Sequence, residues 1–272
     1  MELGDLVRMA RQIRRDIVTM THAAGSGHPG GSLSSADFVT ALYFHKLRHR
    51  PEDPCWEDRD RVIFSKGHVA PVLYAALARS GYFPVDDLTS LRRLGSHLQG
   101  HPCMCTPGVE VGTGSLGQGL SVAVGMAMAA KLDGRPNLFY CVNGDGELQE
   151  GQIWEALMAA GHYKLDNLLT FIDYNNLQID GDVEQVMGIA PLADKLRAFR
   201  WEAVGVDGHD MGALVAALDD FPRRDGKPTA IIGRTIKGKG VSFMENVAGW
   251  HGKAPNDEQY AQAMRELADP EE

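Results

Sequence analysis

Asp145 and Asn175 are the two side chains of this sequence best suited to hold a divalent cation. Asp145 lies in the Gly-Asp-Gly turn that closes the segment 137–146, and Asn175 lies in the Asn-Asn pair that closes the segment 167–176. A hard cation such as Mg²⁺ takes few protein oxygens in near-octahedral geometry and completes its shell with phosphate oxygens. One carboxylate, one amide and a nearby carbonyl therefore suit a magnesium ion that carries a phosphate group. Gly146 leaves the backbone bare, so that a phosphate can approach.

The two segments that end in these residues have the composition of buried strands, and the segment 151–163 between them has the pattern of a helix. Two strands joined by a crossover helix run parallel, and ligands of parallel sheets bind beyond the carboxyl ends of the strands. A glycine-flanked aspartate is common in turns, so an ordinary turn with capping residues is the alternative. The second strand, which ends in two amides about 30 residues later, favours the cation site.

Four of the ten histidines lie in loops beside glycine or proline, and they are His28, His68, His101 and His251. An imidazole donates hydrogen bonds and also carries a proton near pH 7, which suits a ligand with phosphates or several hydroxyls. Any one of them could be an ordinary hydrogen-bonded loop residue. Four in similar loops favour a binding site.

A glycine-rich loop over 112–119 opens a small-residue helix and is suited to close backbone contact with a ligand. Such loops are frequent, so this one alone decides little. Glu150 and Glu155 follow the Gly-Asp-Gly turn at the start of the helix 151–163, where the helix dipole favours carboxylates whatever their role.

The elements along the chain alternate between helices and strands, which predicts an α/β fold with a parallel sheet and helices on both faces. Further helices are expected over 5–23, 35–47, 69–81, 86–93, 115–132, 191–199, 211–220 and 257–268, and further strands over 61–65, 201–206 and 229–235. The segment 25–32 is expected to be a loop. No linker divides the chain, so 1–272 is expected to form a single domain.

The composition is that of an ordinary globular enzyme and excludes several other classes. Apolar residues make up 44% and charged residues 23%, and the net charge of −9 gives no electrostatic footprint for nucleic acid or an anionic membrane. No apolar run is long enough to span a bilayer, and the N-terminus has no secretory signal. We therefore expect a cytoplasmic protein.

The four cysteines, Cys55, Cys103, Cys105 and Cys141, are too few and too scattered for a disulfide framework, which agrees with a reducing compartment. The run 101–105 (HPCMC) invites a zinc interpretation. Its two cysteines lack the spacing of a structural zinc site and no second half follows, so we do not expect zinc there.

Five stretches of the sequence resemble transketolase. They are 26–34 (SGHPGGSLS), 64–75 (FSKGHVAPVLYA), 98–102 (LQGHP), 144–181, which includes the cation motif, and 250–252 (WHG). The resemblance implies the thiamin-diphosphate-binding fold, with thiamin diphosphate as cofactor and Mg²⁺, or Ca²⁺ or Mn²⁺, as the ion. It implies that Asp145, Asn175 and the backbone carbonyl of Leu177 hold the ion, and that Gly146 and Asn175 contact the cofactor.

The resemblance also assigns roles to the four loop histidines. It implies that His68 and His251 contact the diphosphate. It implies that His28, His101 and His251 line the substrate channel, bind the ketose hydroxyls and assist proton transfer. His162, on the predicted crossover helix, is expected to be structural, and His209 is expected at the domain surface or an interface.

The glycine-rich loop and the two glutamates receive roles in the same way. The resemblance implies that Gly114 and Leu116 touch the aminopyrimidine ring, with Ser115 where the family often has proline. It implies that Glu150 joins a glutamate network that links paired active sites across a subunit interface, and that Glu155 supports the structure near the metal.

The resemblance covers almost the whole chain but only about the first half of a typical transketolase. The pyrimidine-binding and C-terminal domains are then expected on a partner chain, in an α2β2 assembly that transfers a two-carbon ketol unit from a ketose (phosphate) to an aldose (phosphate). A fragment of 1-deoxyxylulose-5-phosphate synthase or a subunit of a 2-oxoacid dehydrogenase would share the metal motif. The sequence that follows the Gly-Asp-Gly turn and the loops that contain the histidines favour transketolase over these two enzymes. A noncatalytic regulatory relative is the alternative from another class.

Overall fold

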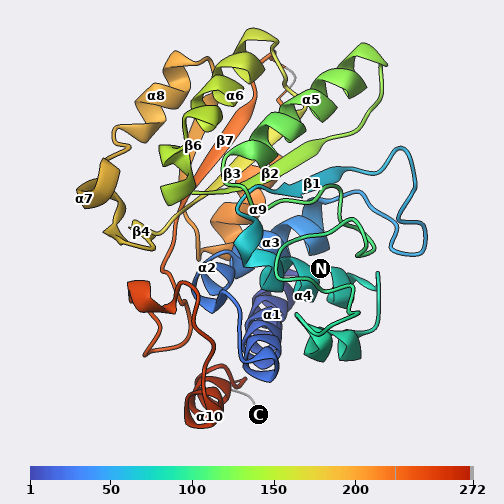
Figure 1. The fold of residues 1–272 in the computed structure, drawn as a ribbon. Coiled ribbons are helices and arrows are strands. Elements are labelled where there is room, and N and C mark those ends of the chain that lie inside the picture. Colours follow the sequence, from blue (N-terminus) through green and yellow to red (C-terminus); the bar gives the residue numbers. More distant parts are fainter. Residues whose placement is uncertain (224, 270–272) are drawn as a thin grey trace.

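A parallel sheet of five strands forms the centre of the computed structural model, which describes residues 1–223 and 225–269 (Figure 1). The strand order is β1-β2-β3-β7-β6, and every neighbouring pair is parallel. Their bounds are β1 (Arg61–Phe64), β2 (Phe139–Gly144), β3 (Leu168–Tyr174), β6 (Glu202–Asp207) and β7 (Thr229–Arg234). The predicted α/β fold with a parallel sheet is confirmed.

The two strands that precede the predicted cation site lie side by side in the middle of this sheet. Both are buried almost throughout, as expected for strands covered on two faces. The register pairs Phe139 with Leu168 and Gly144 with Asp173. Asp145 and Asn175 therefore follow their strands at the same edge of the sheet.

Helices cover both faces of the sheet, and the sheet divides the hydrophobic core into two parts (Figure 1). One half of the core contains Ile153, Leu168 and Trp201, and the other contains Phe38 and Phe171, whose rings stack with centroids 3.8 Å apart. The first face carries α5 (Gln118–Leu132), α6 (Gly151–His162) and α8 (Leu192–Ala198); the second carries α1 (Leu3–Ala24), α3 (Ala36–Ala41), α4 (Ala70–Ser80) and α9 (Met211–Asp219). The last helix, α10 (Asp257–Glu266), packs on α1.

Several predicted elements differ in detail. The expected loop 25–32 already contains the start of α2 (Pro29–Ser34), because Pro29 suits the first helical turn. The expected helix 35–47 consists of α3 and a π-helical turn over Leu42–Lys46, and the expected helix near 86–93 is a 3₁₀ helix over Val85–Ser90. A hairpin of β4 (Leu177–Gln178) and β5 (Gly181–Asp182) and the short α7 (Val183–Met187) were not predicted, since elements this short carry little periodicity. In the part of the chain that the structure describes, no helix has the length and apolarity to span a membrane.

Candidate cofactor-binding site

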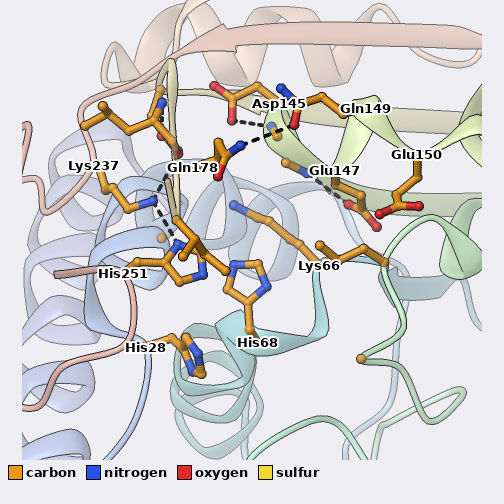
Figure 2. Close-up of a pocket in the computed structure, with 18 of the residues that line it drawn as sticks. His28, Lys66, His68, Asp145, Glu147, Gln149, Glu150, Gln178, Lys237 and His251 are labelled. Carbon is orange, nitrogen blue, oxygen red and sulfur yellow. Dashed lines mark hydrogen bonds between the residues drawn. The ribbon is translucent and has the colours of Figure 1, made fainter. Parts of the chain in front are cut away.

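A cavity of about 340 Å³ lies at the carboxyl ends of β2 and β3, where ligands of parallel sheets bind (Figure 2). It collects nearly all the residues that the sequence pointed to. Those lining it are His28, His68, His101, Gly114, Leu116, Asp145, Gly146, Glu150, Asn175, Leu177 and His251. Segments from the whole length of the chain thus meet at one place.

The three expected cation ligands, Asp145, Asn175 and Leu177, all line this cavity. The carboxylate of Asp145 accepts hydrogen bonds from the backbone N–H groups of Gly146, at 2.8 Å, and Asn176. Asn175 donates its amide N–H to Asp173, so its Oδ1 is turned the other way and accepts from Leu177 N at 3.1 Å. Asn176 has φ 60°, a left-handed conformation that asparagine tolerates, and the chain turns there.

The chemistry of these donors fits a hard divalent cation. Burial, with a smaller contribution from nearby Asp173, raises the pKa of Asp145 to about 6, so its ionised form lacks a full counter-charge. One carboxylate, one amide and one carbonyl leave room for phosphate oxygens in the shell of Mg²⁺. No cluster of three or more His, Cys, Asp or Glu that could hold a metal occurs among residues 1–223 and 225–269, so the mixed oxygen set is the candidate.

The four loop histidines form one cluster. The ring of His28 lies with its centroid 5.4 Å from that of His68, 6.2 Å from that of His101 and 5.5 Å from that of His251, and the rings of His68 and His251 are 4.8 Å apart. The loop of His101 is held by the hydroxyl of Tyr74, which donates to its carbonyl at 3.1 Å. The sequence spacing alone could not show this convergence.

The pKa values of all four histidines are lowered in the folded chain, first of all by burial. Burial, then the positive charge of Arg92, lowers the pKa of His28 to about 4, and burial, then Lys237, lowers the pKa of His251 to about 3. Burial also lowers the pKa of His68 well below its usual range. A neutral imidazole both donates and accepts hydrogen bonds, so the cluster can hold hydroxyl groups and exchange protons with them.

Two lysines that the sequence did not single out supply positive charge (Figure 2). Lys66 pairs with the buried carboxylate of Asp173, and Lys237 donates to the carbonyl of Leu177 and contacts His251 Nδ1, both at 3.1 Å. Burial lowers the pKa of Lys237 to about 8. Lys66 lies in the same short motif as His68, which is the one signal that could have identified it.

Asp173 holds the ends of several elements together. Its carboxylate accepts hydrogen bonds from Ser34, Ser35, Lys66, Asn175 and Thr235. These donors come from the end of α2 and from the segments that follow β1, β3 and β7. Asp173 itself does not line the cavity, and its hydrogen bond with Asn175 orients that side chain.

Glu147 has the structural role near the cation site that Glu155 was expected to have. Its buried carboxylate accepts from Ser65 Oγ at 2.5 Å, from the backbone of Gly117 and Gly144 at 2.9 and 3.1 Å, and from the amide of Asn143. Glu155 is exposed on α6 and does not line the cavity, so the structure does not give it the predicted supporting place.

The glycine-rich loop reaches the cavity through its backbone. Gly114 has φ 150°, and a Cβ there would lie 3.1 Å from the ring of His101, so a larger residue would be strained and crowded. The helix that follows begins at Gln118 rather than at 115. Glu150 lines the cavity mouth directly before α6.

The cysteines and the two remaining predicted histidines do not line this cavity. The structure links Cys103 and Cys105 in a disulfide that was not expected, and Cys55 and Cys141 are free. His162 is exposed at the end of α6. His209, expected at the domain surface or an interface, is half-buried, and its ring is hydrogen-bonded to Asp37 and to the backbone of Ile236.

Comparison with known proteins gives this cavity a context. Residues 5–271 match the family described as "Transketolase, thiamine diphosphate binding domain". The chain belongs to the transketolase family. A 6-deoxy-6-sulfo-D-fructose transketolase subunit from Clostridium sp. (strain MSTE9) is 46% identical over 264 residues, which are 97% of this chain and 96% of the relative. An apulose-4-phosphate transketolase subunit from Phocaeicola vulgatus is 42% identical over 269 residues, 99% of this chain and 96% of the relative.

Solved transketolases share the fold. The transketolase of Campylobacter jejuni superposes with a TM-score of 0.93 at 36% identity, and the match covers 98% of this chain and 43% of that one. This chain therefore spans less than half of that enzyme. It spans nearly the full length of the two relatives that are named as subunits. The predicted resemblance to the first half of transketolase is confirmed.

Proposed function

We propose that this chain is the N-terminal subunit of a split thiamin-diphosphate-dependent transketolase, a single diphosphate- and metal-binding domain over 1–272. In the assembled enzyme it transfers a two-carbon ketol unit from a ketose to an aldose. The observation that carries the proposal is the cavity itself, which brings Asp145, Asn175 and Leu177 together with four histidines and two lysines. The oxygen ligands and the lysines suit a cofactor with an anionic, metal-bound diphosphate, and the histidines suit a polyhydroxylated substrate.

In this proposal the residues that line the cavity have separate roles. Asp145, Asn175 and the Leu177 carbonyl would hold Mg²⁺, or Ca²⁺ or Mn²⁺, which would neutralise the charge of the diphosphate. Lys237, with His68, His251 and the bare backbone at Gly146, binds the diphosphate oxygens. Gly146 is suited to this because a Cβ there would lie 2.7 Å from that of Gln178, which leaves no room for a side chain.

The remaining groups act on the reacting molecules. Thiamin diphosphate, when bound, supplies the nucleophilic carbon and the electron sink for ketol transfer. His28, His101 and His251 bind the hydroxyls of the ketose and exchange protons with them, which their neutral state permits. Gly114 and Leu116 pack against the aminopyrimidine, and Glu150 at the cavity mouth faces the neighbouring active site.

A second polypeptide completes the site in this proposal. The two relatives of the same length are named as subunits, and the solved transketolase is more than twice as long. The C-terminal transketolase subunit would cover the cavity and supply the pyrimidine-binding domain. We also propose that two such pairs of chains assemble as α2β2 and that the protein acts in the cytoplasm.

A ketol-transfer assay tests this function. The chain is assayed alone and mixed with a candidate C-terminal transketolase chain, and the Asp145→Ala variant is assayed in the same mixture. The ketoses offered are pentose phosphates, apulose 4-phosphate and 6-deoxy-6-sulfofructose. Activity that needs both chains and Asp145 supports the proposal. Activity of the chain alone contradicts the split site, and a complex that binds thiamin diphosphate without turnover favours the noncatalytic relative.

A further inference from the structure

His209 is a histidine outside the cavity whose ring is fixed at both nitrogens. It lies between β6 and α9, and its side chain is 13% exposed. Nδ1 lies 2.7 Å from Asp37 Oδ2, and Nε2 lies 2.8 Å from the backbone nitrogen of Ile236. Because a backbone N–H can only donate, Nε2 accepts and Nδ1 carries the proton that is donated to Asp37.

Asp37, which accepts the hydrogen bond from this ring, is itself held in place by an ion pair. Arg14 of α1 pairs with Asp37 through both terminal nitrogens, with Nη1 at 3.0 Å from Oδ1. Both side chains are buried, and Asp37 lies on α3. The row Arg14–Asp37–His209 therefore connects the helical layer to the end of β7.

The other end of this row is next to Lys237. Ile236 directly precedes Lys237, whose ammonium reaches the Leu177 carbonyl and His251. The flanking residues are held as well, because Thr235 N donates to Tyr174 O at 3.1 Å and Gly238 N donates to Gly30 O at 2.9 Å. Between these two anchors, the side chain of His209 holds the backbone of Ile236.

We propose that His209 is a positioning residue, which acts through Ile236 to place the ammonium of Lys237 where the diphosphate of the cofactor binds. The inference rests on the proposed function. Without the imidazole acceptor, the N–H of Ile236 must find water, and the backbone that carries Lys237 loses its central anchor. The ring donates to Asp37 and accepts from Ile236, and it does not line the cavity.

Side-chain length offers a matched pair of variants. The carbonyl of glutamine reaches the position of Nε2 and can accept from Ile236, whereas asparagine reaches only the position of Nδ1, beside Asp37. We expect His209→Asn to raise the Kd of thiamin diphosphate in the Mg²⁺-containing two-chain complex about tenfold, and His209→Gln to raise it about threefold or less. Calorimetry measures both, and His162→Asn, on the exposed end of α6, is the control.

A double-mutant cycle separates positioning from general support. Lys237→Met removes the ammonium, so His209→Asn in that background should raise the Kd less than about twofold. A further tenfold loss in the Lys237→Met background overturns the inference, as does wild-type affinity in His209→Asn. If His209→Asn does not fold, His209→Ala replaces it in the same cycle. Alanine removes the imidazole without placing an amide group beside Asp37.

Amide hydrogen exchange of 235–238, in the complex without cofactor, keeps the inference and the proposed function distinguishable. Faster exchange there in His209→Asn but not in His209→Gln supports the positioning role, and equal exchange in all three proteins overturns it. A wild-type complex that does not bind thiamin diphosphate would instead overturn the proposed function.

Discussion

The ammonium of Lys237 donates a hydrogen bond to the carbonyl oxygen of Leu177, 3.1 Å away. This carbonyl is one of the three oxygens that we assign to the divalent cation. A cation bound to this carbonyl would compete with the ammonium for the same oxygen, and an ammonium released from it would be available to the diphosphate. The depressed pKa of Lys237, about 8 because of burial, agrees with a cation that is poorly satisfied where it lies.

Removal of this ammonium should therefore separate metal binding from cofactor binding. We expect Lys237→Met to leave the affinity for Mn²⁺ alone unchanged or higher, and to weaken binding of thiamin diphosphate at least about tenfold. Electron paramagnetic resonance of free Mn²⁺ and calorimetry with the cofactor measure the two affinities. A parallel fall in both would show that Lys237 does not compete with the metal.

Asp145 should be indispensable for metal-dependent cofactor binding, because it is the one carboxylate of the oxygen set. In the two-chain complex, Asp145→Ala should weaken binding of thiamin diphosphate with Mg²⁺ by at least about 100-fold, and a chelator should do the same to the wild type. Asp180→Asn, an exposed carboxylate on the nearby hairpin, is the matched control. Undiminished affinity in Asp145→Ala would remove the assignment of the cation site.

Glu147 should contribute to stability rather than to ligand binding. Glutamine at 147 keeps one acceptor oxygen but turns an NH₂ group towards donors that the second carboxylate oxygen now satisfies. We expect Glu147→Gln to lower the free energy of unfolding by about 2–4 kcal/mol. Glu155→Gln, on the exposed face of α6, should change it by less than about 0.5 kcal/mol. Urea denaturation followed by circular dichroism compares the two, and equal midpoints would contradict this role.

The histidine cluster should make stability depend on pH. The pKa values of His28 and His251 are lowered in the folded chain to about 4 and about 3, whereas unfolded histidine titrates near 6.5. Between those values the unfolded chain binds protons that the folded chain does not. Stability from these residues is thus fully present above about pH 6.5 and is lost as the pH falls towards 4.

The double variant His28→Gln/His251→Gln should show this directly. Its urea midpoint should fall less than that of the wild type between pH 7 and pH 5. Parallel curves for the two proteins would show that both rings titrate normally in the folded chain.

The sequence allowed the sheet and most of the cavity lining to be predicted because their signals are local. The turn at Asp145 and the amides after β3 each follow an apolar run, and a parallel sheet brings such ends together. Glu147 could not be found this way, because its partner Ser65 lies 82 residues away. A polar residue inside a turn looks the same in sequence whether it is buried or exposed.

The exposed position of Glu155 does follow from the pattern of its helix. Ile153, Ala156, Leu157 and Ala160 mark the buried side of α6, so Glu155 must point to solvent. His209 is different, because nothing in its own loop indicates that Asp37 and Ile236, 172 and 27 residues away, fix its ring.

The five donors to Asp173 have a consequence for how the site comes into being. Ser34 is 139 residues from Asp173, Lys66 is 107 and Thr235 is 62, so its partners meet only after β1 has paired with β2, β2 with β3 and β3 with β7. Contacts of such long sequence separation form late in folding. A truncated or partly folded chain would therefore lack the cation site altogether. Uptake of the ion would then be all-or-none, and it would show that the sheet is complete.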